Sequence, residues 1–274
     1  MPLVHLPNGT NLHYRLEWIN QESHRAPIVF IHGLGSSQNY YGAVCESLNK
    51  SSLHIRFDTP GSGRSPVPPG PQTLETLSDD VISLLDLLTL ETVSLVGHSL
   101  GGLIACNVAA THPSRVKKLI LIGPVHPTPN TQKIFEDRIN TLKEGTYLPI
   151  PKKSNDDSGG LDAIAERIPI SATGSNTTPL ARAFIRELIL SQDPRGYYSL
   201  CRVLAESSPP NYSQIVASTL IIAGEEDMAA PIEGCKAIQA GISGRVKLEI
   251  LSGVRHWHCI EAPEQVAAAI DRFI

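Results

Sequence analysis

The chain has 274 residues, of which 41% are hydrophobic and 18% are charged, and its formal net charge is -4. This length is sufficient to bury one large core. The small negative charge argues against the basic surface on which nucleic-acid binding depends, and no stretch approaches the roughly 20 apolar residues of a membrane-spanning helix. We therefore expect a globular domain that binds neither nucleic acid nor a membrane.

The cysteines and the first residues indicate a compartment. The five cysteines are scattered along the chain and include no C-x-x-C pair, so neither a disulfide framework nor a structural zinc site is expected. The opening MPLVHLPNGTNLHY lacks the basic and apolar regions of a signal peptide. These patterns favour a cytoplasmic protein without a bound metal, and they leave a homodimer open as its oligomeric state.

Short apolar, β-branched runs recur along the chain. An N-terminal hairpin is predicted first, with LVHL and NLHYRLEW on either side of an Asn8-Gly9 turn. Six later runs show little alternation of apolar and polar residues, which is typical of parallel strands buried on both faces. They are 28–31, 52–57, 92–96, 116–122, 219–223 and 246–251.

Helical patterns lie between the predicted strands. Apolar residues recur at spacings of three and four over 74–88, and the segment 262–274 places an apolar stripe along one helix. Since strands and helices alternate, the sequence predicts an α/β fold with a mostly parallel, doubly wound sheet.

The alternation fails between residues 124 and 214. Three helices are predicted there, at 130–145, 178–190 and 197–207, together with a polar loop at 152–160 and no strand. We therefore predict a helical lid inserted at 124–214, and a core made of residues 1–123 and 215–274.

The strongest chemical signal is GHSLGG at 97–102, which follows a predicted strand and opens a predicted helix. A G-x-S-x-G sequence indicates a nucleophilic serine only in this strand–turn–helix context. The glycines permit a tight turn, and the helix N-terminus offers free amide groups beside Ser99. A simple Gly-Ser turn is the alternative interpretation.

A glycine-rich loop, HGLGSS at 32–37, follows the predicted strand 28–31. Such a loop allows backbone amides to point into a site. We predict that the amides of Leu34 and Leu100 form an oxyanion hole, which would stabilise the negative oxygen of a tetrahedral intermediate.

A serine needs a base, and the base needs a carboxylate that orients it. His256 follows the last predicted strand, and His258 is its rival two residues later. Asp227 follows the strand predicted at 219–223, where Glu225 and Glu226 are alternatives. The chain order Ser99, Asp227, His256 is the order of serine, acid and base that accompanies a G-x-S-x-G turn of this kind.

These motifs give the chain a resemblance to the α/β-hydrolase superfamily over nearly its whole length. They are HGLG (32–35), FDTPGSGRS (57–65), GHSLGG (97–102), AGEED (223–227) and GVRHWHCIEAPEQV (253–266). In that superfamily the acid ends a G-x-x-D motif, and the base stands five residues before E-x-P. The resemblance thus implies Asp227 as the acid and favours His256 over His258.

Two further stretches, 66–88 and 193–206, are similar to 3-oxoadipate enol-lactonases and related small-lactone hydrolases. This narrower resemblance implies cofactor-free hydrolysis of a small-molecule ester or lactone. Two alternatives stay open: a hydrolase that cleaves a carbon–carbon bond of a vinylogous diketone, and a ligand receptor built on a hydrolase fold. The predicted pocket residues are Tyr40, His126, Tyr197, Tyr198 and Trp257.

Overall fold

The computed structural model describes residues 3–17, 26–48, 52–147 and 160–274. Eight strands form one sheet in the spatial order β1-β2-β4-β3-β5-β6-β7-β8. They are β1 (Leu3–His5), β2 (Asn11–Glu17), β3 (Ile28–Ile31), β4 (His54–Asp58), β5 (Val93–His98), β6 (Val116–Ile122), β7 (Ser218–Gly224) and β8 (Val246–Leu251).

The sheet is antiparallel at its N-terminal end and parallel elsewhere. Strands β1 and β2 form the predicted hairpin, and β2 pairs antiparallel with β4. All other neighbours, from β4–β3 to β7–β8, pair in parallel. The predicted doubly wound sheet with an N-terminal antiparallel hairpin is confirmed.

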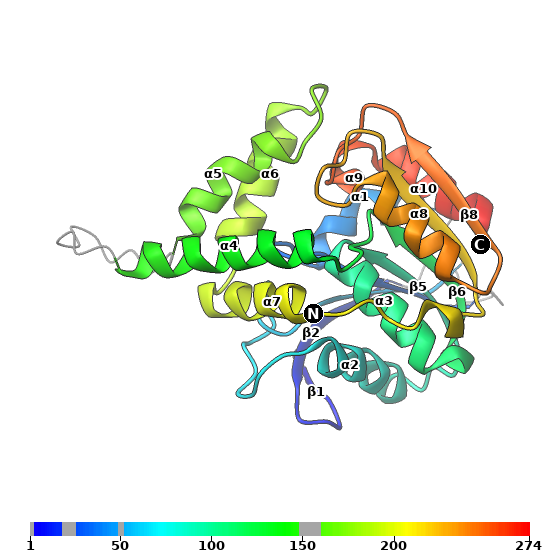
Figure 1. Cartoon of the computed structure of the whole chain (residues 1–274). Coiled ribbons are helices and arrows are strands. Elements are labelled where there is room, and N and C mark those ends of the chain that lie inside the picture. The colour runs from blue at the N-terminus through cyan, green and yellow to red at the C-terminus, as the bar shows by residue number, and fades with distance from the viewer. Residues whose placement is uncertain (1–2, 18–25, 49–51, 148–159) are drawn as a thin grey trace.

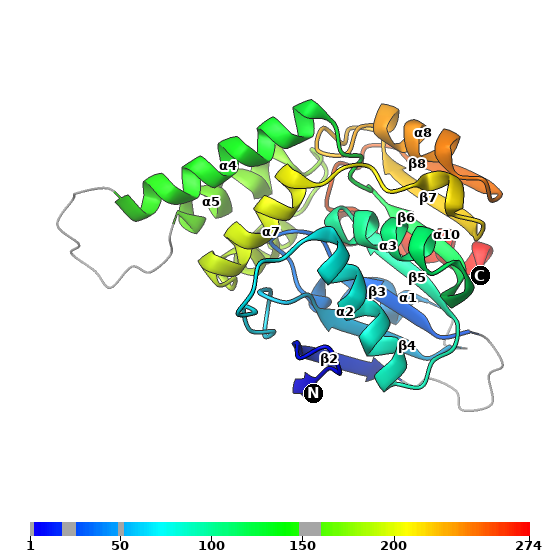
Figure 2. The same ribbon diagram turned by 60° about the horizontal axis from the view of Figure 1, so that its bottom comes forward.

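Helices cover both faces of the sheet (Figures 1 and 2). The helices are α1 (Gly42–Ser47), α2 (Leu74–Leu87), α3 (Leu100–Thr111), α4 (Pro129–Tyr147), α5 (Leu161–Ser171), α6 (Pro179–Leu190), α7 (Pro194–Glu206), α8 (Ile232–Gly241), α9 (His258–Glu261) and α10 (Pro263–Phe273). Single 3₁₀ turns occur at η1 (Gln38–Tyr41), η2 (Pro113–Arg115) and η3 (Tyr212–Gln214).

The core consists of two layers, one on each face of the sheet. Along β3, Val29 and Ile31 pack toward α2 and α3, whereas Ile28 and Phe30 pack toward α1 and α10. Successive strand residues point to opposite faces, so both faces of this central strand need apolar side chains. This is why the parallel strands show little alternation in sequence.

Helices α4–α7, which we call the cap helices, come between β6 and β7 in the chain. Figure 1 shows them together at one end of the molecule, beside the sheet. Helix α5 has no counterpart among the predicted helices, and Pro169 lies inside it. The predicted polar loop at 152–160 lies, except for residue 160, outside the described residues.

Polar residues at the helix starts account for several boundaries. The Thr73 hydroxyl accepts from the Thr76 amide and begins α2, while Thr178 and Asp193 cap α6 and α7 in the same way. Each side chain satisfies an amide that has no acceptor within its helix. Within the described ranges, no helix is both long and apolar enough to cross a bilayer.

All five cysteines are free and buried. They lie on five different helices, as Cys45, Cys106, Cys201, Cys235 and Cys259. Burial raises the pKa of Cys45, Cys201 and Cys235 to about 12. These thiols are therefore held protonated as small apolar groups of the core.

Candidate active site

Ser99 lies at the junction of β5 and α3, in a backbone conformation with a positive φ of 54°. A Cβ atom on Gly97 would lie 2.2 Å from the Gly101 carbonyl oxygen, and one on Gly101 would lie 2.0 Å from the Ile31 carbonyl oxygen. Neither contact is sterically possible, so only glycine fits at these two positions. The tight turn holds Ser99 at the carboxyl edge of the sheet, in a strained conformation typical of functional sites.

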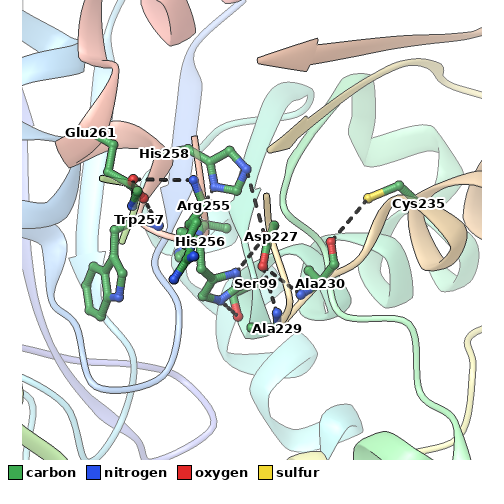
Figure 3. A network of polar contacts seen from close by, with 12 residues as sticks. Ser99, Asp227, Ala229, Ala230, Cys235, Arg255, His256, Trp257, His258 and Glu261 are labelled. Carbon is green, nitrogen blue, oxygen red and sulfur yellow. Dashed lines mark hydrogen bonds and ion pairs between the residues drawn. The ribbon is translucent and has the colours of Figure 1, made fainter. Parts of the chain in front are cut away.

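The side chains of Ser99, His256 and Asp227 form a continuous series (Figure 3). His256 Nε2 lies 3.0 Å from Ser99 Oγ, and His256 Nδ1 lies 2.8 Å from Asp227 Oδ2. The three residues come from the ends of β5, β8 and β7, which meet at one edge of the sheet. The imidazole is thus placed to accept the serine proton while the carboxylate fixes its orientation.

The Asp227 carboxylate is completely buried. Its Oδ1 atom accepts hydrogen bonds from the amides of Ala229 at 2.8 Å and Ala230 at 2.9 Å, which leaves Oδ2 for His256. Burial alone would raise the pKa of Asp227, but the His256 imidazole and its hydrogen bond hold it well below its ordinary value. The carboxylate is therefore ionised at neutral pH.

Two further histidines hold the backbone of the loop that carries His256, which we call the His256 loop. The His256 carbonyl accepts hydrogen bonds from His98 Nε2 at 2.8 Å and from His258 Nδ1 at 2.9 Å. Burial lowers the pKa of His258 to about 4, and burial with the neighbouring imidazoles holds the pKa of His98 well below its ordinary value. Both rings are neutral at pH 7, and His256 rather than His258 contacts Ser99.

The two glutamates that compete with Asp227 in the sequence have other contacts. Glu225 accepts from the Ser252 hydroxyl and the Gly253 amide, and Glu226 lies 3.5 Å from the Arg255 guanidinium. Both side chains are exposed. Of the three acidic residues, Asp227 is the one that contacts His256.

The two predicted oxyanion donors lie on elements next to Ser99. Leu34 lines the same cavity as Ser99 and His256. Leu100 is the first residue of α3, where an amide has no acceptor within the helix. His32 fixes the loop before Leu34. Its Nδ1 donates a hydrogen bond to the Gly33 carbonyl, and its Nε2 accepts one from the Thr59 amide. The oxyanion role of both leucine amides stays a prediction.

A cavity of about 350 Å³ opens beside Ser99 and His256. Three of the predicted pocket residues, His126, Tyr197 and Trp257, line this cavity, and its walls are mostly apolar. Such a cavity suits a small ligand with few polar groups.

Tyr40 and Tyr198 do not belong to the lining of this cavity. The Tyr40 ring stacks on His98 with centroids 4.4 Å apart, and its hydroxyl accepts from the Cys259 amide. Tyr40 therefore packs beside the His256 loop, against His98. Tyr198 is partly buried and packs against the core layer that contains Ile28 and Phe30.

Two residues that the sequence interpretation did not assign to the site also belong to its surroundings. Arg138 on α4 lines the cavity. Glu261 accepts from the amides of Gly174, Arg255 and Trp257 and from the Thr177 hydroxyl, and thereby joins the His256 loop to the connection between α5 and α6. The shared helix face of Thr131, Phe135 and Arg138 is the sequence signal that could have revealed Arg138.

One group of potential metal ligands occurs among the described residues, away from Ser99. Glu17, Cys45 and His54 place ligand atoms within 4.8 Å of one another. His54 begins β4, so this group lies at the opposite edge of the sheet. The Glu17 carboxylate already pairs with Arg15 and Arg56, and we assign the group no role in the site.

Comparisons with known proteins give the family and the fold. The family model of the alpha/beta hydrolase fold matches residues 26–263. The enol-lactonase of Burkholderia xenovorans LB400 superimposes with a TM-score of 0.87 at 25% identity, covering 99% of each chain. A thermophilic esterase of Thermogutta terrifontis superimposes with a TM-score of 0.85 at 24% identity, covering 100% of this chain and 98% of its own.

Curated relatives by sequence include RutD of Caulobacter sp. (strain K31), whose name assigns it provisionally to carbamate hydrolysis. It is 25% identical over 260 residues, which are 92% of this chain and 91% of that protein. RutD of Caulobacter segnis is 31% identical, but the match spans 46% of its length and 44% of this chain. Because the family model matches most of the sequence, the chain belongs to the alpha/beta hydrolase fold family.

Proposed function

We propose that the chain is a serine hydrolase that cleaves a small carboxylic ester or lactone. Ser99 is the nucleophile, His256 the general base and Asp227 the acid that orients the base. The observation that carries this proposal is the hydrogen-bonded series from Asp227 through His256 to Ser99, which ends at a mostly apolar cavity.

The reaction has two halves. His256 Nε2 takes the Ser99 proton while Ser99 Oγ bonds to the substrate carbonyl carbon, and the resulting oxyanion is held by the amides of Leu34 and Leu100. The intermediate collapses to an acyl-enzyme as the imidazolium returns its proton to the leaving oxygen. His256 then deprotonates a water that attacks the acyl carbon, and the imidazolium returns this proton to Ser99 Oγ as the bond between Ser99 and the acyl group breaks. With a lactone, both product groups stay in one hydroxy acid.

The surroundings of the site support this assignment. The ionised Asp227 stabilises the imidazolium that forms during each half. The cap helices supply much of the cavity wall, and we propose that residues 124–214 act as a lid while 1–123 and 215–274 carry the chemistry. The functions named for the structural relatives, enol-lactonase and esterase among them, favour acyl transfer to water.

The test combines active-site labelling with a substrate panel. A fluorophosphonate probe should label the wild type and fail to label S99A, and intact-mass spectrometry would count the adduct. The panel comprises p-nitrophenyl esters, five- and six-membered lactones, aryl carbamates and a vinylogous diketone. We expect multiple turnovers of an ester or lactone, and activity that survives S99A nearly intact would contradict the mechanism.

The same panel separates the alternatives. Turnover of the vinylogous diketone with little action on esters would replace ester hydrolysis by carbon–carbon bond cleavage. A single acylation without turnover of any substrate would instead indicate a ligand receptor.

A further inference from the structure

His98 is a buried titratable residue that takes no part in the proposed reaction. It ends β5, directly before Ser99, and is 2% exposed. Its Nε2 lies 2.8 Å from the His256 carbonyl oxygen, and because a carbonyl oxygen can only accept, Nε2 carries the proton. Burial holds the pKa of His98 well below its ordinary value, so the ring is neutral. The single N–H of this ring therefore points at the backbone of the proposed general base.

The packing around His98 leaves its ring little room to turn. The Tyr40 ring stacks on one face, with centroids 4.4 Å apart and an angle of 27° between the planes. At the ring edge, a Cβ on Gly33 would lie 2.8 Å from Nδ1, so the backbone of Gly33 is in close contact with that edge. The position of the ring, and with it the direction of the N–H, is thus set by its neighbours.

His258 donates to the same carbonyl oxygen, but it cannot replace His98. Its Nδ1 lies 2.9 Å from that oxygen. Since His258 is two residues from His256 in the chain, its hydrogen bond shapes the His256 loop locally. His98, in contrast, belongs to the sheet and is joined to Ser99 by one peptide bond. The His98 bond therefore fixes the loop relative to the proposed nucleophile.

These contacts form a closed ring. Ser99 Oγ lies 3.0 Å from His256 Nε2, the His256 carbonyl accepts from His98, and the backbone of His98 leads back to Ser99. The His256 amide makes a different contact, because it donates to the Ala172 carbonyl, which follows cap helix α5, at 3.1 Å. Without the His98 bond, the backbone of His256 would keep this link to the cap and lose one to the sheet.

We propose that His98 is a positioning residue, whose N–H sets the distance between Ser99 Oγ and the His256 imidazole. This inference rests on the proposed serine hydrolase site and adds a residue to it. A displacement of about 1 Å in a reacting group can cost about 100-fold in rate. His98 does not belong to the lining of the cavity beside Ser99, so its loss should lower kcat and leave KM nearly unchanged.

The first experiment compares three replacements that separate the donor from the ring. H98F keeps a ring without a donor, H98Q places an amide N–H at about the reach of Nε2, and H98N places it too close to the backbone, at the position of Nδ1. For a p-nitrophenyl ester, we expect kcat to fall about 100-fold in H98F and H98N, and less than about tenfold in H98Q. KM should change by less than about twofold in all three.

Two outcomes would overturn the proposal. One is a wild-type kcat in H98F, and the other is an H98Q variant that is as slow as H98N, since the ring and not the donor would then matter. Urea denaturation checks that the variants fold, and the His256 carbonyl keeps the His258 donor in each of them. If H98F does not fold, the comparison of H98Q with H98N decides alone.

A control variant lies at the far end of the helix that follows Ser99. His112 is the C-cap residue of α3 and is partly exposed. H112F makes the same exchange of imidazole for phenyl without touching the His256 loop. It should keep the wild-type kcat and KM, so a loss in H98F that H112F does not share belongs to the position of His98.

Crystal structures keep this inference apart from the proposed reaction. We expect the distance between Ser99 Oγ and His256 Nε2 to grow by more than about 0.5 Å in H98F and to stay near the wild-type value in H98Q. If the wild type turns over no ester but this displacement is seen, the hydrolase proposal fails while the positioning role stands. An unchanged distance in H98F would overturn the positioning role.

Discussion

The Glu261 carboxylate accepts a hydrogen bond of 2.7 Å from the backbone amide of Gly174. This bond joins the His256 loop to the connection between α5 and α6. The same carboxylate accepts from the amides of Arg255 and Trp257 on either side of His256. A second link reinforces the joint, since the His256 amide donates to the Ala172 carbonyl at 3.1 Å. The position of His256, the proposed general base, is thus tied to the connection between two cap helices.

Replacing Glu261 should therefore disturb catalysis and folding together. E261A leaves three backbone amides without their acceptor, so we expect a loss of about 3 kcal/mol in the free energy of unfolding and at least a tenfold fall in kcat. Urea denaturation and ester turnover measure the two effects. E226A is the matched control, because Glu226 is exposed and its ion pair with Arg255 is long, and it should change stability by less than about 0.5 kcal/mol.

Asp227 should control the tautomer of His256. In D227N the amide can donate to Nδ1 of the imidazole, which leaves the proton on Nε2 and removes the acceptor for the Ser99 hydroxyl. We expect kcat for a p-nitrophenyl ester to fall about 10⁴-fold with the fold intact. E225Q, in the same loop, should retain wild-type turnover, and a fall of less than tenfold in D227N would contradict the assigned role.

His258 should make stability depend on pH. Its folded pKa is about 4 against an ordinary 6.5, so between these values the unfolded chain binds a proton that the folded chain does not. Stability due to this group is complete above pH 6.5 and falls by about 3 kcal/mol as the pH is lowered to 4. H258N retains a donor for the His256 carbonyl and should lack this contribution.

Urea denaturation of both proteins between pH 4 and 7.5 measures the difference. The pKa of His98 is held low as well, so the comparison of the wild type with H258N, rather than the wild-type slope alone, isolates His258. Parallel pH dependences in the two proteins would show that His258 titrates normally in the folded state.

The turn that carries Ser99 should tolerate no side chain at Gly101. An added Cβ would lie 2.0 Å from the Ile31 carbonyl oxygen. No side-chain rotation can relieve this clash, because Gly101 and Ile31 meet through their packed backbones. We expect G101A to lose at least about 3 kcal/mol of stability or to fail to fold. G70A is the control, since a Cβ there has no neighbour within 4 Å. Circular dichroism during urea denaturation distinguishes the two variants.

The sequence predicts the sheet and the neighbourhood of Ser99 well, because both depend on local patterns. Each parallel strand is a short apolar run, and Ser99, Asp227 and His256 each follow one of these runs. Since the carboxyl ends of parallel strands share one edge, chain position alone brings the three residues together. The distances between their side chains required the structure.

The pocket was less predictable, because it depends on how the cap helices pack. Tyr197 and Tyr198 are adjacent on α7, yet only Tyr197 lines the cavity. Aromatic character does not tell which face of a helix turns inward. Helix α5 was not predicted, and Pro169, which lies inside it, normally disfavours a helix interior.

Because all five sulfhydryls are buried, their rates of alkylation report where the folded structure opens. A thiol reagent attacks the thiolate, so each cysteine reacts only when its surroundings come apart. Cys201 belongs to cap helix α7, whereas Cys106 lies on α3 in the core layer that contains Val29 and Ile31. The order in which these two are alkylated during mild denaturation would therefore reveal whether the cap separates before the sheet unfolds.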